Sequence, residues 1–221
     1  MLVKTVPYTP VNPTLTHSMP PLSLGTTIIV MKYSNGVLLS ADTRATMGNL
    51  VVDRFIPKVL PITDKIYTCI AGSVSHAQFL VNEVRAHLMT QQMDLHANLN
   101  GMDPMVATAA NIISIYLHKY REFLHAAFIL GGVDNTGFHC INSMIGGSVL
   151  EEDYAISGSG GVFIKGLMKE LYRPELTRTE AINLAHKLLK TAISLDTKSG
   201  GFMRFVAVEQ NGLAEEGTRM L

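Results

Sequence analysis

The residues best suited to chemistry in this chain are Gly25 and Thr26, where a proline-rich leader gives way to a β-rich segment. Threonine is a poor nucleophile unless a base lies beside its hydroxyl. If the bond between Gly25 and Thr26 is cut, Thr26 gains an α-amine next to that hydroxyl. An α-amine has a pKa near 8, so roughly a tenth of it is neutral at pH 7, whereas an ordinary lysine is almost fully protonated. Thr26 could then supply both nucleophile and general base. Gly25 lacks a side chain, which we expect to let the bond adopt the strained geometry of self-cleavage.

Asp42 lies sixteen positions after Thr26, and Lys58 lies sixteen positions after Asp42. Asp42 ends one β-rich run, and Lys58 begins another. An Asp42–Lys58 pair beside Thr26 would keep a positive charge near the amine and lower its pKa, which favours the neutral, basic form. Taken alone, Asp42 could simply cap a turn and Lys58 could be a surface lysine.

Other candidate sites have simpler interpretations. The loop at 158–161 lies between a predicted strand and a predicted helix, but it lacks the Lys-Ser/Thr of a Walker loop, so a tight turn is preferred over a phosphate site. Cys69 and Cys140 lie in apolar strand-like segments and are predicted to be buried thiols. The histidines show no metal-ligand spacing, and the acidic residues at 151–153 are predicted to form a solvated loop.

Bulk composition narrows the class of protein. The 221 residues suit one large domain, and the formal net charge of zero gives no sign of a nucleic acid or membrane partner. Only 16% of the residues are charged, well below the usual quarter or so, which favours a subunit whose faces are covered by neighbours. No apolar run reaches the length of a membrane span, and prolines interrupt the leader where a signal peptide needs an apolar core. We expect a protein of the cytoplasm and nucleus.

Hydrophobic periodicity predicts the elements that position these residues. Strands are expected at 27–33, 37–42, 58–62, 66–71, 126–132, 138–143, 154–157 and 202–209, with a short tail after the last. A first helix is expected from about Ser75, with Phe79, Leu80, Val84 and Leu88 on one face, and a second from about Pro104 to Tyr120. A third is expected after residue 161, and a fourth begins at a capping box at 177–180. This order is not the strict alternation of a doubly wound fold. It predicts an α+β protein, a four-layer α-β-β-α sandwich.

A family resemblance emerges from longer stretches. The run "GTTIIVMKYSNGVLLSADTRATMGNLVVDRFIPKVLPITDKIYTCIAGS" resembles the start of a catalytic proteasome beta subunit, an N-terminal-nucleophile hydrolase, and "GSGG" at 158–161 and "LDTKSGG" at 195–201 match as well. The similarity covers essentially all of 26–221. "SGGFMRFVAV" and "GGVDNTGFHCINSMIGG" resemble the caspase-like beta-one type, whereas "RATMGNLV" and "IAGSV" look closer to archaeal beta subunits.

The resemblance implies a threonine endopeptidase with residues 1–25 as a propeptide and 26–221 as the catalytic domain. Thr26 would be the nucleophile, with Asp42 and Lys58 tuning it and the Gly72 N–H forming the oxyanion hole. The residues implied to hold the amine are Ser159, Asp196 and Ser199, and those implied to contact substrate are Ala45, Thr46, Ile70 and Val74. Ile70 would form the pocket floor, where the beta-one type has a basic residue.

The same resemblance implies polypeptide substrates, partner alpha and beta subunits in stacked seven-membered rings, and no metal or organic cofactor. With the leader attached, Thr26 has no free amine, so the precursor is expected to be inactive. Two alternatives stay open: a noncatalytic ring subunit that keeps these residues but stays unprocessed, and a small amidohydrolase of the same superfamily.

Overall fold

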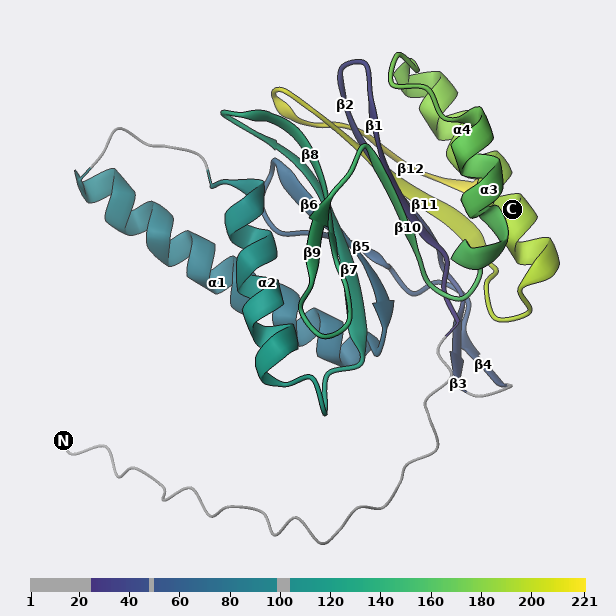
Figure 1. Cartoon of the computed structure of the whole chain (residues 1–221), viewed down its shortest axis with the longest axis horizontal. Coiled ribbons are helices and arrows are strands. Elements are labelled where there is room, and N and C mark those ends of the chain that lie inside the picture. Colours follow the sequence, from purple (N-terminus) through teal and green to yellow (C-terminus); the bar gives the residue numbers. More distant parts are fainter. Residues whose placement is uncertain (1–24, 48–49, 99–103) are drawn as a thin grey trace, which may run out of the picture.

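A computed structural model describes residues 25–47, 50–98 and 104–221, with the side chains of Met47 and of 92–98 left aside. The leader before Gly25 lies outside these residues, so its assignment as a propeptide stays a prediction. The described chain forms two five-stranded sheets packed face to face, with a pair of helices outside each sheet (Figure 1). This arrangement confirms the predicted α-β-β-α sandwich.

The first sheet leads directly out of Gly25 and Thr26. Its strand order is β10-β1-β2-β11-β12, and all neighbouring strands are antiparallel. Its strands are β1 (Ile28–Tyr33), β2 (Gly36–Asp42), β10 (Tyr154–Ser157), β11 (Phe202–Glu209) and β12 (Gly212–Met220). The Asn-Gly signal at 35–36 marks the turn between β1 and β2, because that dipeptide suits the tight turn of a hairpin.

The second sheet has the order β5-β6-β7-β8-β9 and is also antiparallel. Its strands are β5 (Val59–Pro61), β6 (Ile66–Gly72), β7 (Ala126–Asp134), β8 (Gly137–Ser143) and β9 (Val149–Glu151). Every residue of β7 is buried. The strand expected at 126–132 is therefore confirmed, and as the central strand of its sheet it is covered on both faces.

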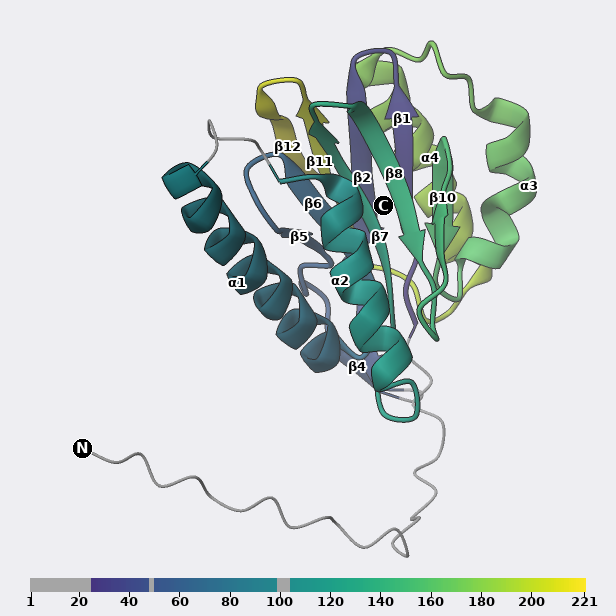
Figure 2. The same cartoon turned by 60° about the vertical axis from the view of Figure 1, so that its left-hand side comes forward.

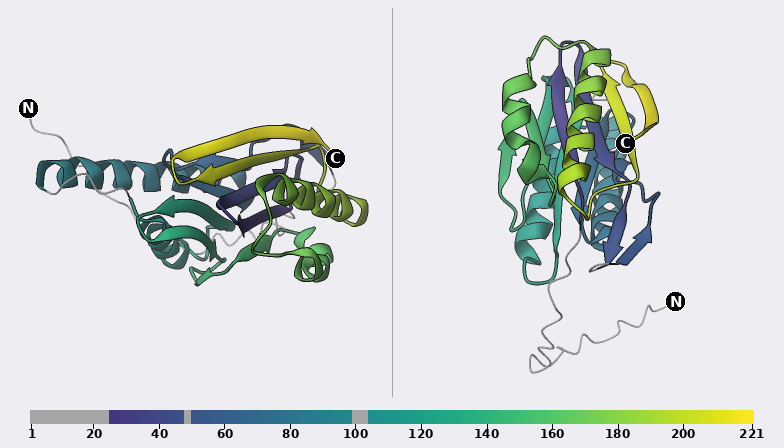
Figure 3. Two further views of the ribbon diagram at one scale, coloured as in Figure 1. Left: turned by 90° about the horizontal axis from the view of Figure 1, so that it is seen from above. Right: turned by 90° about the vertical axis from the view of Figure 1, so that its right-hand side faces the viewer.

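The helices form the two outer layers. Helices α1 (Val74–Asn98) and α2 (Val106–Lys119) cover the second sheet (Figure 2). Helices α3 (Gly161–Leu171) and α4 (Arg178–Leu195) cover the first sheet and lie in front of it in the right-hand view of Figure 3. The predicted capping box begins α4: the Glu180 N–H donates to Thr177 Oγ1 at 3.4 Å, and the Thr177 N–H donates to the Glu180 carboxylate at 2.8 Å. None of the described helices combines the length and the apolar composition of a membrane-spanning helix.

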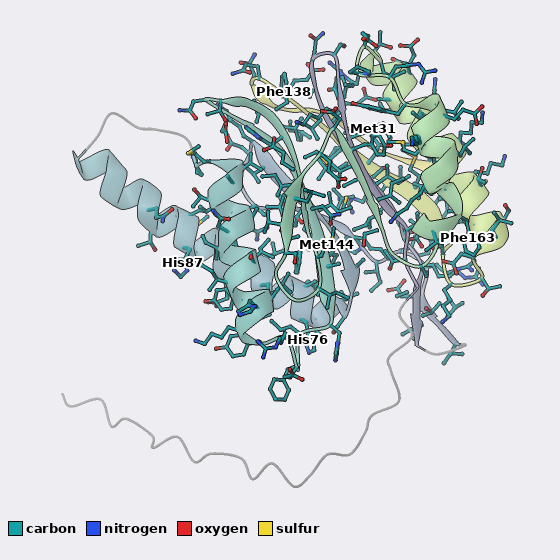
Figure 4. All side chains as sticks on the ribbon, viewed as in Figure 1. Met31, His76, His87, Phe138, Met144 and Phe163 are labelled. Atoms are coloured by element: carbon teal, nitrogen blue, oxygen red, sulfur yellow. The ribbon has the colours of Figure 1, made fainter. Side chains whose placement is uncertain are left out.

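Three apolar clusters fill the spaces between the four layers. Alternate residues of β1 face different layers: Ile29 and Met31 pack toward α3 and α4, whereas Ile28 and Val30 pack between the sheets. Figure 4 labels Met31 between the first sheet and helices α3 and α4. Cys69 and Cys140 are buried between the sheets as free thiols, as predicted, and burial raises the pKa of each.

Some predicted details were wrong. Phe79 does not share the buried face of α1, because 55% of its surface is exposed. The helix expected from about Ser75 begins one residue earlier, at Val74. Glu151 does not belong to a solvated loop but ends β9, where its Oε1 lies 2.8 Å from Nδ1 of His139.

Three strand features have no counterpart in the prediction. These are the hairpin of β3 (Ala45–Met47) and β4 (Leu50–Asp53), the short strand β9, and the full nine-residue length of β12, which was expected to be a tail. All residues of β4 and β9 are exposed, and so are most of β12. Without one buried face, a strand shows no regular alternation of apolar and polar residues, and periodicity cannot reveal it.

Candidate active site

Thr26 is buried immediately before β1, and the β1–β2 hairpin explains the position of Asp42 beside it. The hairpin register pairs Ile28 with Ala41, so the residue after Thr26 lies opposite Asp42. The Thr27 N–H donates to Asp42 Oδ1 at 2.9 Å, and the Asp42 N–H donates to the Thr27 carbonyl at 3.2 Å. The sixteen positions that separate Thr26 from Asp42 are thus the length of the β1–β2 hairpin, which brings the chain back beside Thr26.

Asp42 and Lys58 form the predicted ion pair, and both are almost fully buried. Lys58 Nζ lies 2.8 Å from Asp42 Oδ1. The other carboxylate oxygen accepts from the backbone N–H groups of Gly200 at 2.9 Å and Arg44 at 3.2 Å. Burial lowers the pKa of the Lys58 ammonium, and the adjacent Asp42 carboxylate opposes that shift without cancelling it. Lys58 therefore gives up its proton more readily than an ordinary lysine.

A second network holds the nitrogen of Thr26. The Thr26 N–H donates to Ser159 Oγ at 3.2 Å, and Ser159 Oγ donates to Asp196 Oδ2 at 2.6 Å. Ser199 Oγ donates to the same Asp196 oxygen at 2.7 Å. Burial raises the pKa of Asp196, but hydrogen bonds from Ser159 and Ser199 outweigh it, so the pKa lies below its usual value. The structure thus brings these three predicted residues together around Thr26.

The glycine-rich loop at 158–161 packs against Thr26 and Thr27. Gly158 has a φ of +91°, and a Cβ there would meet the Thr26 carbonyl oxygen. A Cβ on Gly160 would meet Thr27 Oγ1 and would lie 3.0 Å from Ser199 Oγ. The preferred tight turn is present, and its glycines allow the loop to approach the site closely.

The carbonyl group of Gly25 faces the groups that would act on it. Thr26 Oγ1 donates to the Gly25 oxygen at 2.5 Å, and Lys58 Nζ lies 3.5 Å from the same oxygen. The Gly25 N–H donates to Thr46 Oγ1 at 3.2 Å, which places the predicted substrate contact Thr46 against the residue before the nucleophile. The hydroxyl, the carbonyl and a basic side chain are therefore assembled in the uncleaved chain.

Lack of space gives a direct reason for the glycine at position 25. Gly25 is not among the glycines with positive φ, so its φ alone does not require a glycine, and the expected strained geometry of self-cleavage stays a prediction. A Cβ on Gly25 would collide with Cβ of Lys198 and lie 2.7 Å from the Lys198 carbonyl oxygen. Any larger residue must displace the 198 backbone or move the scissile carbonyl.

We predict that Gly25→Ala slows removal of the leader. Forcing a methyl group into a packed site costs about 1–3 kcal/mol, equivalent to about 5- to 150-fold in rate if the reactive geometry bears the whole cost. The measurement is a time course of precursor loss by mass spectrometry in assembled particles. Gly166→Ala is the matched control, because a Cβ at this α3 position meets nothing within 4 Å. Equal cleavage rates for wild type and Gly25→Ala would show that the contact with Lys198 is irrelevant.

The remaining predicted residues lie on β3, β6 and α1. Gly72 ends β6 with a φ of +102°, and a Cβ there would meet the His125 carbonyl. Ile70, 2% exposed, packs with Val74 under α1, and its N–H donates to the Lys58 carbonyl at 2.9 Å. Ala45 is partly exposed at the start of β3. The oxyanion role of Gly72 and the substrate contacts of Ala45, Thr46, Ile70 and Val74 stay predictions.

Sequence reasoning missed three contributors to the site. The backbone N–H groups of Arg44 and Gly200 bind Asp42, and the Thr27 side chain bonds to Ser199 at 2.7 Å. Backbone donors leave no signal in side-chain identity, although the glycines at 200–201 hint at a close backbone approach.

Among the described residues, no three His, Cys, Asp or Glu side chains gather as metal ligands would.

Comparison with known proteins agrees with this geometry. The family model described as proteasome subunit matches residues 22–208. Proteasome subunit beta type-6 of Dictyostelium discoideum is 32% identical over 193 residues, covering 87% of this chain and 88% of that protein. A probable proteasome subunit beta type-1 of Encephalitozoon cuniculi is 35% identical, covering 86% and 90%. Proteasome subunit beta 1 of the archaeon Korarchaeum cryptofilum is 34% identical, covering 87% and 91%. The resemblance to proteasome beta subunits is thereby confirmed, and the chain belongs to the proteasome subunit family.

Proposed function

We propose that this chain is a catalytic subunit of the proteasome core particle, a threonine endopeptidase that exposes Thr26 by removing residues 1–25. The observation that carries the proposal is the Thr26 hydroxyl bonded to the Gly25 carbonyl beside the buried Lys58. The nucleophile, the target carbonyl and a basic side chain therefore lie together, which is the arrangement that acyl transfer to a hydroxyl needs.

Self-cleavage proceeds by acyl transfer within the chain. Thr26 Oγ attacks the carbonyl carbon of Gly25, and the bond from that carbon to the Thr26 nitrogen breaks. An ester then joins Gly25 to Thr26 Oγ, and the hydroxyl proton ends on the released amine. Before cleavage that nitrogen is an amide and cannot act as a base. Lys58 Nζ, paired with Asp42, lies 3.5 Å from the attacked carbonyl oxygen, where its positive charge stabilises the negative charge that develops on that oxygen. Water hydrolyses the ester and releases the leader as a carboxylate.

Substrate cleavage repeats the same chemistry with the free amine as general base. The amine takes the proton of the Thr26 hydroxyl as Oγ attacks the substrate carbonyl, and it then protonates the departing peptide amine. Ser159 holds the nitrogen at 3.2 Å, and the ionised Asp196 orients Ser159. Water finally cleaves the acyl ester and restores Thr26.

The noncatalytic, unprocessed subunit is the competing function. The family match favours a proteasome subunit over a small amidohydrolase, but it does not distinguish a processed from an unprocessed subunit. The complete set of Thr26, Asp42, Lys58, Ser159 and Asp196 in bonding contact favours the catalytic subunit. The deciding experiment is N-terminal sequencing of the chain from purified particles. A chain beginning at Thr26 supports the enzyme, and one that retains its leader supports the noncatalytic subunit.

As a member of this family the chain assembles with other proteasome subunits. We propose that it lies in one of the stacked seven-membered beta rings, in the cytoplasm and nucleus. Its proposed substrates are unfolded or ubiquitin-targeted polypeptides. Large apolar side chains exposed on several faces support assembly: Leu50 and Phe55 at the β3–β4 hairpin, Phe123 after α2, and Val162 and Phe163 on α3. Figure 4 labels Phe163 on the helix pair α3 and α4. Adjacent exposed apolar side chains such as Val162 and Phe163 are typical of faces that a partner covers.

We predict that the site prefers apolar over acidic residues before the cleaved bond. Ile70 offers no partner to a carboxylate, and burying an unpaired charge costs several kcal/mol, whereas an apolar side chain gains about 1.5–3 kcal/mol. Fluorogenic peptides ending in Leu, Asp or Glu are compared on assembled particles whose other active sites are blocked. Leucine peptides are expected to be cut at least about tenfold faster.

Two variants test the role of Ile70 in this preference. Ile70→Leu keeps the apolar floor and should leave the order unchanged, while Ile70→Arg should move it toward acidic residues. Because Ile70 is buried, the arginine variant needs a check of assembly by native gel. Faster cleavage after Asp or Glu by the unmodified subunit would contradict the pocket assignment and favour a beta-one specificity.

A further inference from the structure

Thr27 bonds to both networks around Thr26. Its backbone N–H donates to Asp42 Oδ1, which also binds Lys58. Its side-chain Oγ1 lies 2.7 Å from Ser199 Oγ, which binds Asp196. Neither Thr27 nor Ser199 exposes any surface.

The direction of these hydrogen bonds follows from the number of protons. An ionised carboxylate only accepts, and each serine hydroxyl has one proton to donate. Ser159 and Ser199 both donate to Asp196 Oδ2. Ser199 Oγ can then only accept from Thr27, so the Thr27 hydroxyl is the donor that completes the chain. Ser159 Oγ is likewise left to accept from the Thr26 N–H.

Water cannot take the place of the Thr27 hydroxyl. Gly160 covers the contact so closely that even a Cβ there would meet Thr27 Oγ1, Ser199 Oγ and Asp196 Oδ2. A buried acceptor that loses its donor in such a space stays unpaired, which is costly. The contact is therefore sensitive to the identity of residue 27.

The position of Thr27 gives this contact a function. Regular pairing of β1 begins only at Ile28. After cleavage, Thr26 becomes the chain terminus, and termini fray unless they are tied down. We propose that Thr27 is a positioning residue whose hydroxyl ties the new terminus to Ser199 and Asp196 and so keeps the Thr26 amine at Ser159. The inference rests on the proposed threonine endopeptidase.

Three variants test this role in assembled particles whose other active sites are blocked. Thr27→Val keeps the shape and removes the hydroxyl, Thr27→Ser keeps the hydroxyl, and Thr68→Val is the matched control, a fully buried β6 threonine bonded only to backbone carbonyls. Activity is normalised to the fraction of chains that begin at residue 26. We expect kcat for Thr27→Val to fall about tenfold to a hundredfold, with KM within about twofold. Thr27→Ser and Thr68→Val should stay within about threefold of wild type.

Cryo-electron microscopy of the same particles gives a readout that does not depend on activity. In Thr27→Val we expect the Thr26 amine to have left Ser159, and in Thr27→Ser and Thr68→Val to remain there. An undisplaced Thr26 or an unchanged kcat in Thr27→Val overturns the positioning role. If wild-type particles cut no peptide, the proposed function fails, and displacement of Thr26 in the variant structure still decides whether Thr27 is the anchor.

Discussion

Replacing Thr26 with alanine should abolish both peptide cleavage and removal of the leader. In the proposed mechanism the same oxygen attacks Gly25 in the precursor and the substrate in the mature chain, and alanine has no oxygen to replace it. The structure supports one nucleophile for both reactions, because Thr26 Oγ1 already contacts the Gly25 carbonyl. Mass spectrometry of the purified chain should find residues 1–25 still attached, with cleavage at the background of uncatalysed hydrolysis.

Thr26→Ser is the matched variant, since it keeps the hydroxyl and removes a methyl group. It should retain self-cleavage at a reduced rate. The assembly must contain no other active subunit, because a neighbour could trim the leader in trans. Fully trimmed Thr26→Ala chains in such particles would show that another protease performs the maturation.

Replacing Lys58 with alanine should lower both self-cleavage and peptide cleavage by several orders of magnitude. Lys58 is the basic group nearest the attacked carbonyl, at 3.5 Å from its oxygen, and it neutralises Asp42. Groups that act as a unit lose nearly all activity when one is removed. Removing one partner of a buried pair also costs about 3–5 kcal/mol of stability, so assembly and melting temperature must be measured alongside kcat/KM.

Two further substitutions separate charge and geometry. Lys58→Arg keeps the charge, but its planar group replaces a compact ammonium in a buried site, so it should restore activity poorly. Lys32→Ala is the control, because it breaks a partly exposed ion pair with Glu151 at 3.4 Å, and such pairs contribute little. Lys58→Ala activity within about threefold of wild type would remove Lys58 from the mechanism.

Much of the fold could be predicted because its signals are local. Strand and helix periodicities are read over about ten residues, and the capping box at 177–180 joins neighbours in the chain. The approach of Thr26 to Asp42 is also local in this sense, because one tight turn at 35–36 folds two adjacent strands together. The exposed strands β4 and β9 could not be predicted in this way, because pairing with a neighbouring strand defines them and no buried face gives them a sequence pattern.

The sequence by itself determined the candidate chemistry: a threonine that can become an N-terminus, a carboxylate one hairpin away from it, a lysine sixteen residues further on, and a resemblance that named the remaining site residues. Only the tertiary structure decided how these residues act on one another. Ser159 reaches Thr26 across 133 positions and Gly200 reaches Asp42 across 158, and no local pattern encodes contacts between such distant segments. The space around Gly25 and the link from Thr27 to Ser199 likewise exist only once the loops pack, because sterics and hydrogen-bond direction depend on atoms brought together by the fold.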